Sequence, residues 1–383
     1  MKSAREIRLF RMVQVMCAVV FAIFSFTYLS FFQAPLLEIA YDLTATGKLQ
    51  YNENITAAII TFVLLVLTLW FNKYAKFTRE WEALSYLPAC TMLAFVTNID
   101  RTIYTGLQFS WFWVWVAAAV LLLYLSASWV LQRVLFMRIK DITRAANRIM
   151  WRNLLLLTIL FCFTGVLSSG DENFKHEAMV YHYVKHNDYD AAKRVAHRSL
   201  AASQQLTAGR SYVLAMNGVL GDSLFTYPQY YGIDGLLPTE QQTSPLTADM
   251  VYDLLKVTRQ KGERTLPFLE RALSVDTASA AVKDYYLSAL LLDKRLEEFV
   301  TSLPAFYNVS DSVPLPKHYK EALVLYNKIT ENAPLQIQDA ELEEAYSKLL
   351  ALEREHQDIL VRSNYTRRFF GNTYWWYYLY ADN

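Results

Sequence analysis

The chain has 383 residues, of which 54% are hydrophobic, and its 37 Lys and Arg residues nearly balance its 36 Asp and Glu residues. The balance hides an uneven distribution, because the positive excess lies in the apolar first part of the chain and the rest is acidic, which argues against nucleic-acid binding. The three cysteines, Cys17, Cys90 and Cys162, all lie in apolar stretches before residue 170. The rest of the chain therefore has no disulfide framework and no thiolate metal site.

Composition divides the chain near residue 170. Residues 1–170 contain long apolar runs and 15 Lys and Arg residues against 8 Asp and Glu residues, a net charge of +7. Residues 171–383 resemble soluble sequence and contain 22 Lys and Arg residues against 28 Asp and Glu residues, a net charge of −6. We therefore predict a transmembrane domain over 1–170 and a separate water-soluble domain over 171–383.

Five apolar segments of the first domain approach the roughly 17–25 residues that a helix needs to cross a bilayer. They are residues 12–37, 55–71, 83–99, 106–131 and 153–169. Segment 12–37 is too long for the apolar region of a cleaved signal peptide, so we interpret it as a retained anchor. Segment 83–99 has the weakest signal, because it is short and contains Pro88.

The basic residues between these segments predict the orientation of the chain. Thirteen fall in the N-terminal tail and in the loops after the second and fourth segments, and two, Lys48 and Arg101, fall in the opposite loops. Because positive residues stay in the cytoplasm, we expect a cytoplasmic N-terminus and, in a bacterial inner membrane, a periplasmic C-terminal domain. The middle of each segment lacks charged residues, which argues for an anchor rather than a channel or pump.

The soluble domain is predicted to be helical throughout. Residues 176–203 read as two helices joined by a polar turn, with Tyr183 and Ala192 placed where the helices cross, as in a tetratricopeptide hairpin. Weaker helical signals follow over 268–280, 284–299, 318–329 and 341–355. The expected fold is all-α: a bundle of about five transmembrane helices followed by a degenerate tetratricopeptide-like α-solenoid.

One stretch, residues 221–245, breaks the helical pattern. It contains several glycines and prolines together with the aromatic residues Phe225, Tyr227, Tyr230 and Tyr231. A long irregular segment in a compact domain is often functional. It is either a segment that contacts a ligand or partner, or an ordered connector whose aromatic rings fill the solenoid.

The densest aromatic cluster is the tail, where six of the seven residues Tyr374–Tyr380 are aromatic. The candidate binding residues in it are Tyr374, Trp375, Trp376, Tyr377 and Tyr378. Seven residues are too few to span a bilayer. The tail could cap the last repeat, lie at the membrane surface with the help of Arg367 and Arg368, or form an exposed partner-binding patch.

Four sequence runs carry a family resemblance: VLAMNGVLGDSLFTYPQYYGIDGLLP, LSALLLDKRLEEFVTSLPAFY, LPKHYKEALVLY and FFGNTYWWYYLY. Together they resemble an uncharacterised family of integral membrane proteins from Bacteroides-type bacteria, in which a multi-span region carries a tetratricopeptide-like extracytoplasmic domain. The resemblance implies an envelope location and a helical-repeat domain. It implies no activity and no catalytic residues.

Catalytic signals are sparse. Glu38 and Asp42 follow the first segment on the outer side, where membrane glycosyltransferases that use lipid-linked donors place a carboxylate. Such a pair is also common on exposed turns. His182 and His186 would share a helix face but lack further ligands for a metal. Nucleotide-binding and hydrolase motifs are absent, so we expect no cofactor.

The predicted function is binding rather than catalysis. We expect an inner-membrane protein whose periplasmic domain binds or scaffolds envelope proteins or peptides, with the lipid bilayer as its other partner and no nucleic acid. The alternative is a glycosyltransferase-like enzyme that acts on a lipid-linked substrate through Glu38 and Asp42.

Overall fold

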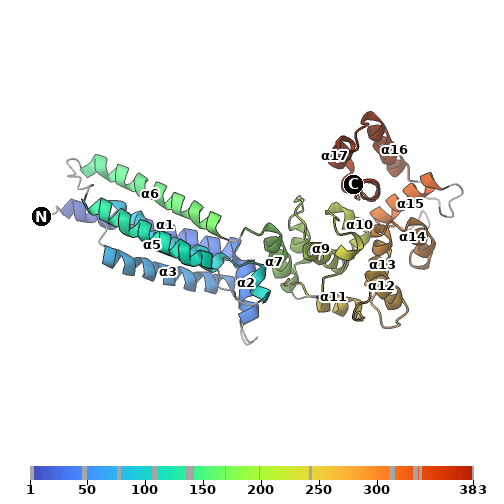
Figure 1. Ribbon diagram of the computed structural model, residues 1–383, viewed down its shortest axis with the longest axis horizontal. Helices are drawn as coiled ribbons and strands as arrows, with labels where there is room; N and C mark the ends of the chain where they lie inside the picture. The colour runs from blue at the N-terminus through green and yellow to red at the C-terminus, as the bar shows by residue number, and fades with distance from the viewer. Residues whose placement is uncertain are drawn as a thin grey trace. The chain divides into compact units, whose positions relative to one another are not determined.

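The computed structural model describes residues 4–44, 50–75, 79–105, 111–133, 142–168, 170–197, 199–240, 244–309, 315–330, 335 and 339–381. These residues form helices and connecting turns without a β-strand among them, so the predicted all-α class is confirmed. The chain divides into two compact units, Met1–Asp171 and Glu172–Asn383 (Figure 1).

The first unit consists of long helices, in which α1 packs against α3 and α6, and α4 packs against α3, α5 and α6 (Figure 1). In chain order the elements are α1 (Ala4–Thr27) with a π-helical continuation (Tyr28–Phe32), α2 (Ala34–Thr44), α3 (Glu53–Ala75), a 3₁₀ helix (Arg79–Tyr86), α4 (Leu87–Thr97), a 3₁₀ helix (Arg101–Thr105), α5 (Trp111–Arg133) and α6 (Ile142–Leu167).

Three helical stretches in the described residues are long and apolar enough to cross a membrane: Arg8–Phe32, Glu53–Asn72 and Ala146–Leu167. The sequence predicted five. The apolar part of α5, Phe112–Ser126, is shorter, and residues 106–110 of that predicted span lie outside the described residues. The remaining helix, α4, has 11 residues. At 1.5 Å per residue it rises about 16 Å, half of a bilayer core of about 30 Å.

Two prolines explain where helices differ from the bounds of the predicted spans. Pro88 lies in the first turn of α4, and the residues before it form a 3₁₀ helix instead of extending α4. The first span ends at Phe32 rather than Leu37, because the chain leaves the helix at Gln33 and starts α2 with Pro35 in its first turn. Proline fits the first turn of a helix but disrupts a helix interior.

The α1 helix shows how this unit divides buried from exposed side chains. Val13, Cys17 and Phe21 follow at intervals of four residues and are fully buried against neighbouring helices. On the opposite side, Val15 and Ile23 are 62% and 63% exposed. Large apolar side chains exposed along a helix of bilayer length are typical of a lipid-facing surface.

The second unit consists of shorter helices. They are α7 (Glu172–Lys185), α8 (Tyr189–Arg194), α9 (Gln204–Met216), α10 (Leu220–Ser223), 3₁₀ helices at Leu224–Thr226 and Gly232–Gly235, α11 (Ala248–Leu255), α12 (Thr265–Leu273), α13 (Ala281–Leu292), α14 (Leu296–Ser302), a 3₁₀ helix (Leu303–Ala305), α15 (Lys317–Ile329), α16 (Ala340–Glu355), α17 (Ile359–Phe370) and α18 (Tyr374–Tyr380).

The core of the second unit is built around α9 and α13. Every residue from Gln205 to Leu214 and from Tyr285 to Leu292 is buried. The α13 helix packs against α9, α10, α12 and α14, and α15 packs against α10, α14, α16 and α18. Helices far apart in the chain therefore share one core, whereas in a solenoid each repeat contacts its neighbours.

The local helix predictions for this unit agree with the structure in most places. The signal over 284–299 corresponds to α13 and α14, the signal over 318–329 to α15, and that over 341–355 to α16. The hairpin predicted over 176–203 is shorter than expected, because its second helix, α8, ends at Arg194. The tetratricopeptide-like solenoid stays a prediction.

Candidate functional site

The two aromatic segments identified in the sequence meet in the second unit. The ring of Phe225 lies 5.2 Å from the ring of Tyr374 and 4.9 Å from that of Tyr377. Aromatic rings at these separations pack favourably. The tail therefore packs onto Phe225 of the irregular 221–245 segment, and both segments contribute to one region of the fold.

The short turn between α17 and α18 directs the tail back onto the domain. A Cβ atom on Gly371 would lie 2.5 Å from the carbonyl oxygen of Arg367, so a larger residue would disturb the end of α17. Thr373 then caps α18, because its hydroxyl accepts a hydrogen bond from the N–H of Trp376 at 3.3 Å.

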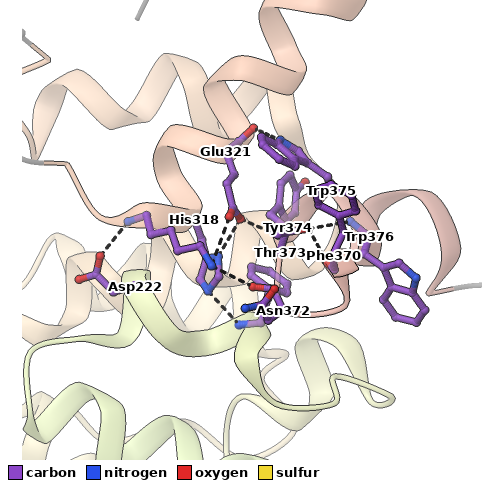
Figure 2. A network of polar contacts seen from close by, with 11 residues as sticks. Asp222, His318, Glu321, Phe370, Asn372, Thr373, Tyr374, Trp375 and Trp376 are labelled. Carbon is purple, nitrogen blue, oxygen red and sulfur yellow. Dashed lines mark hydrogen bonds and ion pairs between the residues drawn. The ribbon is translucent and has the colours of Figure 1, made fainter. Parts of the chain in front are cut away.

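A buried carboxylate joins α15 to α18 (Figure 2). Glu321 is 1% exposed, and its Oε2 accepts hydrogen bonds from the N–H of Tyr374 and from the Nδ1–H of His318, both at 2.8 Å. The backbone carbonyl of Glu321 accepts a third bond, from Nε1–H of Trp375 at 2.6 Å. The ammonium group of Lys317 lies 3.6 Å from its Oε1. This network holds the first turn of α18 in place.

The hydrogen bonds of His318 define its tautomer. Its Nε2 accepts the backbone N–H of Phe225 at 3.3 Å, so this nitrogen carries no hydrogen. The other nitrogen, Nδ1, carries the proton and donates it to Glu321. This fully buried, neutral imidazole connects the 221–245 segment with α15 and, through Glu321, with α18.

A cleft of about 850 Å³ lies beside this network, between the 225–230 stretch and the helices α17 and α18. We call it the C-terminal cleft. Its lining includes Tyr227, Tyr230, Leu360, Arg367, Arg368 and Trp376. No Asp or Glu is among the described residues that line it.

Arg367 is the cationic centre of the C-terminal cleft. It donates a hydrogen bond from Nη2 to the hydroxyl of Tyr230 at 2.9 Å. Its guanidinium carbon lies 4.9 Å from the centre of the Trp376 ring and 5.9 Å from that of Tyr230, within cation–π distance of both. Two aromatic rings thus hold one arginine in place, and Arg368 beside it is exposed.

A third arginine, Arg210, lies behind the ring of Tyr227, which lines the C-terminal cleft. Arg210 is 4% exposed, and its guanidinium lies 4.9 Å from the centre of the Tyr227 ring, which lines the cleft. It donates to the carbonyl of Ala196 at 3.2 Å, while Nε and Nη1 find no acceptor among the described residues. Burial lowers the pKa of Arg210 to about 10, so it remains positively charged at neutral pH.

The structure separates the candidate binding residues into two groups. Five line the C-terminal cleft: Phe225, Tyr227, Tyr230, Trp376 and Tyr377. The other four lie outside its lining: Tyr374 and Trp375 in the core, Tyr378 half-buried and Tyr231 exposed. Aromatic composition alone could not distinguish rings that stabilise the fold from rings available to a ligand.

Glu38 and Asp42, the alternative catalytic carboxylates, lie on a helix rather than on an exposed turn. Glu38 is buried on α2, and Asp42 lies half-buried one helical turn later. The reason is the helix break at Gln33, after which the chain continues as α2. Neither residue lines the C-terminal cleft.

Sequence reasoning missed the residues that organise the site. Arg367 and Arg368 were considered only as helpers of membrane contact, although a basic pair close to an aromatic run also suggests a binding surface. His318 and Glu321 were not identified, although their spacing of three places them on one face of the predicted helix.

Comparisons with known proteins add a partial family match. A family of unknown function (DUF6057) matches residues 248–381. The match includes α11 to α18, and therefore the α17 and α18 side of the C-terminal cleft but not the 225–230 side. It agrees with the resemblance to an uncharacterised family, while the bacterial source and the tetratricopeptide-like domain stay predictions. Neither a curated protein nor a solved structure matches the chain.

Proposed function

We propose that this protein is a membrane-anchored binding protein whose second unit captures a protein or peptide of the bacterial envelope in the C-terminal cleft. The observation that carries this proposal is the cleft itself. It brings together five aromatic residues identified in the sequence and two arginines, on a framework fixed by the buried network of His318 and Glu321.

The membrane part of the proposal rests on three helical stretches of bilayer length and on the uneven distribution of basic residues along residues 1–170. We propose that residues 83–99 also cross the membrane. Residues 83–86, the part of the 3₁₀ helix that follows a kink at Trp81, add about 8 Å to the roughly 16 Å of α4. The helix α4 packs between α3, α5 and α6, where an irregular backbone at membrane depth is tolerated. With α5 as a further span, the N-terminus is cytoplasmic and the second unit periplasmic.

The chemistry of the C-terminal cleft supports binding rather than catalysis. Its aromatic rings and arginines are typical of protein-recognition surfaces, in which Trp, Tyr and Arg contribute most of the affinity. The glycosyltransferase-like alternative relies instead on Glu38 and Asp42, which belong to the first unit.

Site-specific crosslinking tests the proposal. A photoreactive amino acid replaces Asn364, an exposed residue that lines the C-terminal cleft, and the full chain is irradiated in native membranes. The matched control carries the same group at Lys348, which is exposed on α16. We expect a discrete adduct at position 364 that is absent at position 348, and the captured protein, once purified, should bind the wild-type chain and block crosslinking at 364. Identical adducts at both positions, or no adduct at 364, would contradict the proposal.

A further inference from the structure

We infer that the C-terminal cleft recognises an acidic peptide segment, in which Asp or Glu side chains bind Arg367 and Arg368 and a neighbouring apolar side chain binds beside them. This inference rests on the proposed function and specifies the chemistry of the partner.

Charge is the first argument. Arg367 and Arg368 face a cleft whose described lining contains no carboxylate, and no carboxylate of the described residues forms an ion pair with either side chain. Arg210 adds a buried positive charge that is one ring away and has no acidic partner among the described residues. A ligand with carboxylates would compensate this local positive charge, and an arginine can bind a carboxylate through two parallel hydrogen bonds.

The positions of the rings argue for a charged ligand over a neutral sugar. A sugar-binding site usually offers an open aromatic face. Here the guanidinium of Arg367 lies over the faces of both Trp376 and Tyr230. The rings hold the arginine in a fixed position, and less conformational entropy is then lost when it binds a carboxylate.

Exposed apolar residues define the second half of the recognition site. Leu360 and Phe369 line the C-terminal cleft and are 65% and 55% exposed. Covering such side chains removes apolar surface from water, which favours a complex. An acidic segment that also carries an aliphatic or aromatic side chain would cover them.

The concave shape favours a peptide over an anionic membrane surface. Arg367 and Trp376 line a cleft of about 850 Å³, which an extended or helical segment can enter. A bilayer is flat on this scale and contacts protruding side chains rather than the interior of a cleft.

A displayed library of random 12-residue peptides, selected against the purified full chain in detergent, tests this inference. The variant R367Q/R368Q removes the two cleft charges. The control K261Q/R264Q removes two exposed charges from the segment before α12 and changes the net charge equally. We expect wild type and control to enrich peptides rich in Asp and Glu that also contain an apolar residue, and R367Q/R368Q to lose this enrichment.

The affinity of one selected peptide provides the quantitative measurement. We expect R367Q/R368Q to bind it about tenfold more weakly at about 50 mM salt, with the difference shrinking at about 500 mM as the charges are screened. Enriched peptides without an excess of acidic residues would overturn the acidic assignment but leave peptide binding intact. Failure of wild type to enrich any peptide would overturn the proposed function as well. If phosphatidylglycerol in nanodiscs suppresses the enrichment, the arginines bind lipid phosphate instead.

Discussion

Glu321 and Arg210 show how single buried charges define this domain. Inside the protein, two N–H donors and the ammonium group of Lys317 take the place of the water that would surround the carboxylate of Glu321. Its negative charge is therefore compensated. Arg210 has one carbonyl and an aromatic ring as partners. Burying a charge is costly unless it is paired. The charge of Glu321 stabilises the attachment of the tail, and the charge of Arg210 raises the electrostatic potential near the C-terminal cleft.

Replacing Glu321 with Gln should loosen the tail selectively. The amide has one acceptor where the carboxylate had two, and its NH₂ group would face donors, so we expect a loss of about 2–3 kcal/mol in the local stability of α18. Hydrogen exchange of amides 374–380 in the full chain should then become faster. The control is E355Q, which removes an exposed carboxylate from the end of α16. Equal exchange in the two variants would show that Glu321 does not hold the tail.

At the scale of elements, α18 is a seven-residue helix with two functions. Its inner side, with Tyr374 and Trp375, is fully buried against α15. Its outer side carries Trp376, which contacts Arg367 in the C-terminal cleft. Isolated helices of this length are unstable in water, so tertiary packing must maintain it. One short element thus connects the stability of the core to the shape of the cleft.

The two adjacent tryptophans provide a matched test of this division. Trp375 is 1% exposed and donates to the carbonyl of Glu321, so W375A should cost about 3–5 kcal/mol in the free energy of unfolding. Trp376 is half-buried, so W376A should cost less stability but release Arg367 and weaken peptide binding. Chemical denaturation of the full chain in detergent measures the first effect, and the affinity of a selected peptide the second. The reverse pattern would show that the two roles are wrongly assigned.

The elements also show what could be predicted from the sequence. Helices α13 to α16 were predictable because apolar spacing is a local property of the chain. The break at Gln33 was missed because Pro35 lies inside an otherwise continuous apolar run. The contact of Phe225 with Tyr374 and Tyr377 joins positions about 150 residues apart, and its geometry depends on the packing of α10, α13 and α15. Composition identified both aromatic segments but could not pair them.

At the scale of the whole molecule, the two units differ in the sign of their net charge and in where their basic residues lie. The basic residues of 1–170 are concentrated before the first predicted span and between the second and third and the fourth and fifth, a distribution typical of an orientation signal. Residues 171–383 have a net charge of −6, yet their cleft is lined by two arginines and no described carboxylate. A domain of net negative charge disfavours non-specific association with anionic partners. An acidic segment would therefore need to fit the cleft to bind.

The proposed orientation predicts which side of the membrane each unit occupies. In a chain whose three native cysteines are replaced by alanine, one new cysteine is introduced as K2C or K261C, the latter at an exposed position of the second unit. A membrane-impermeant maleimide should label K261C in intact spheroplasts and K2C only after lysis. This result requires an odd number of membrane crossings between residues 2 and 261. The number is odd in the proposed topology because residues 83–99 are counted as a span. If both cysteines were labelled only after lysis, the number of crossings would be even, and α4 would be a buried helix that does not cross the bilayer.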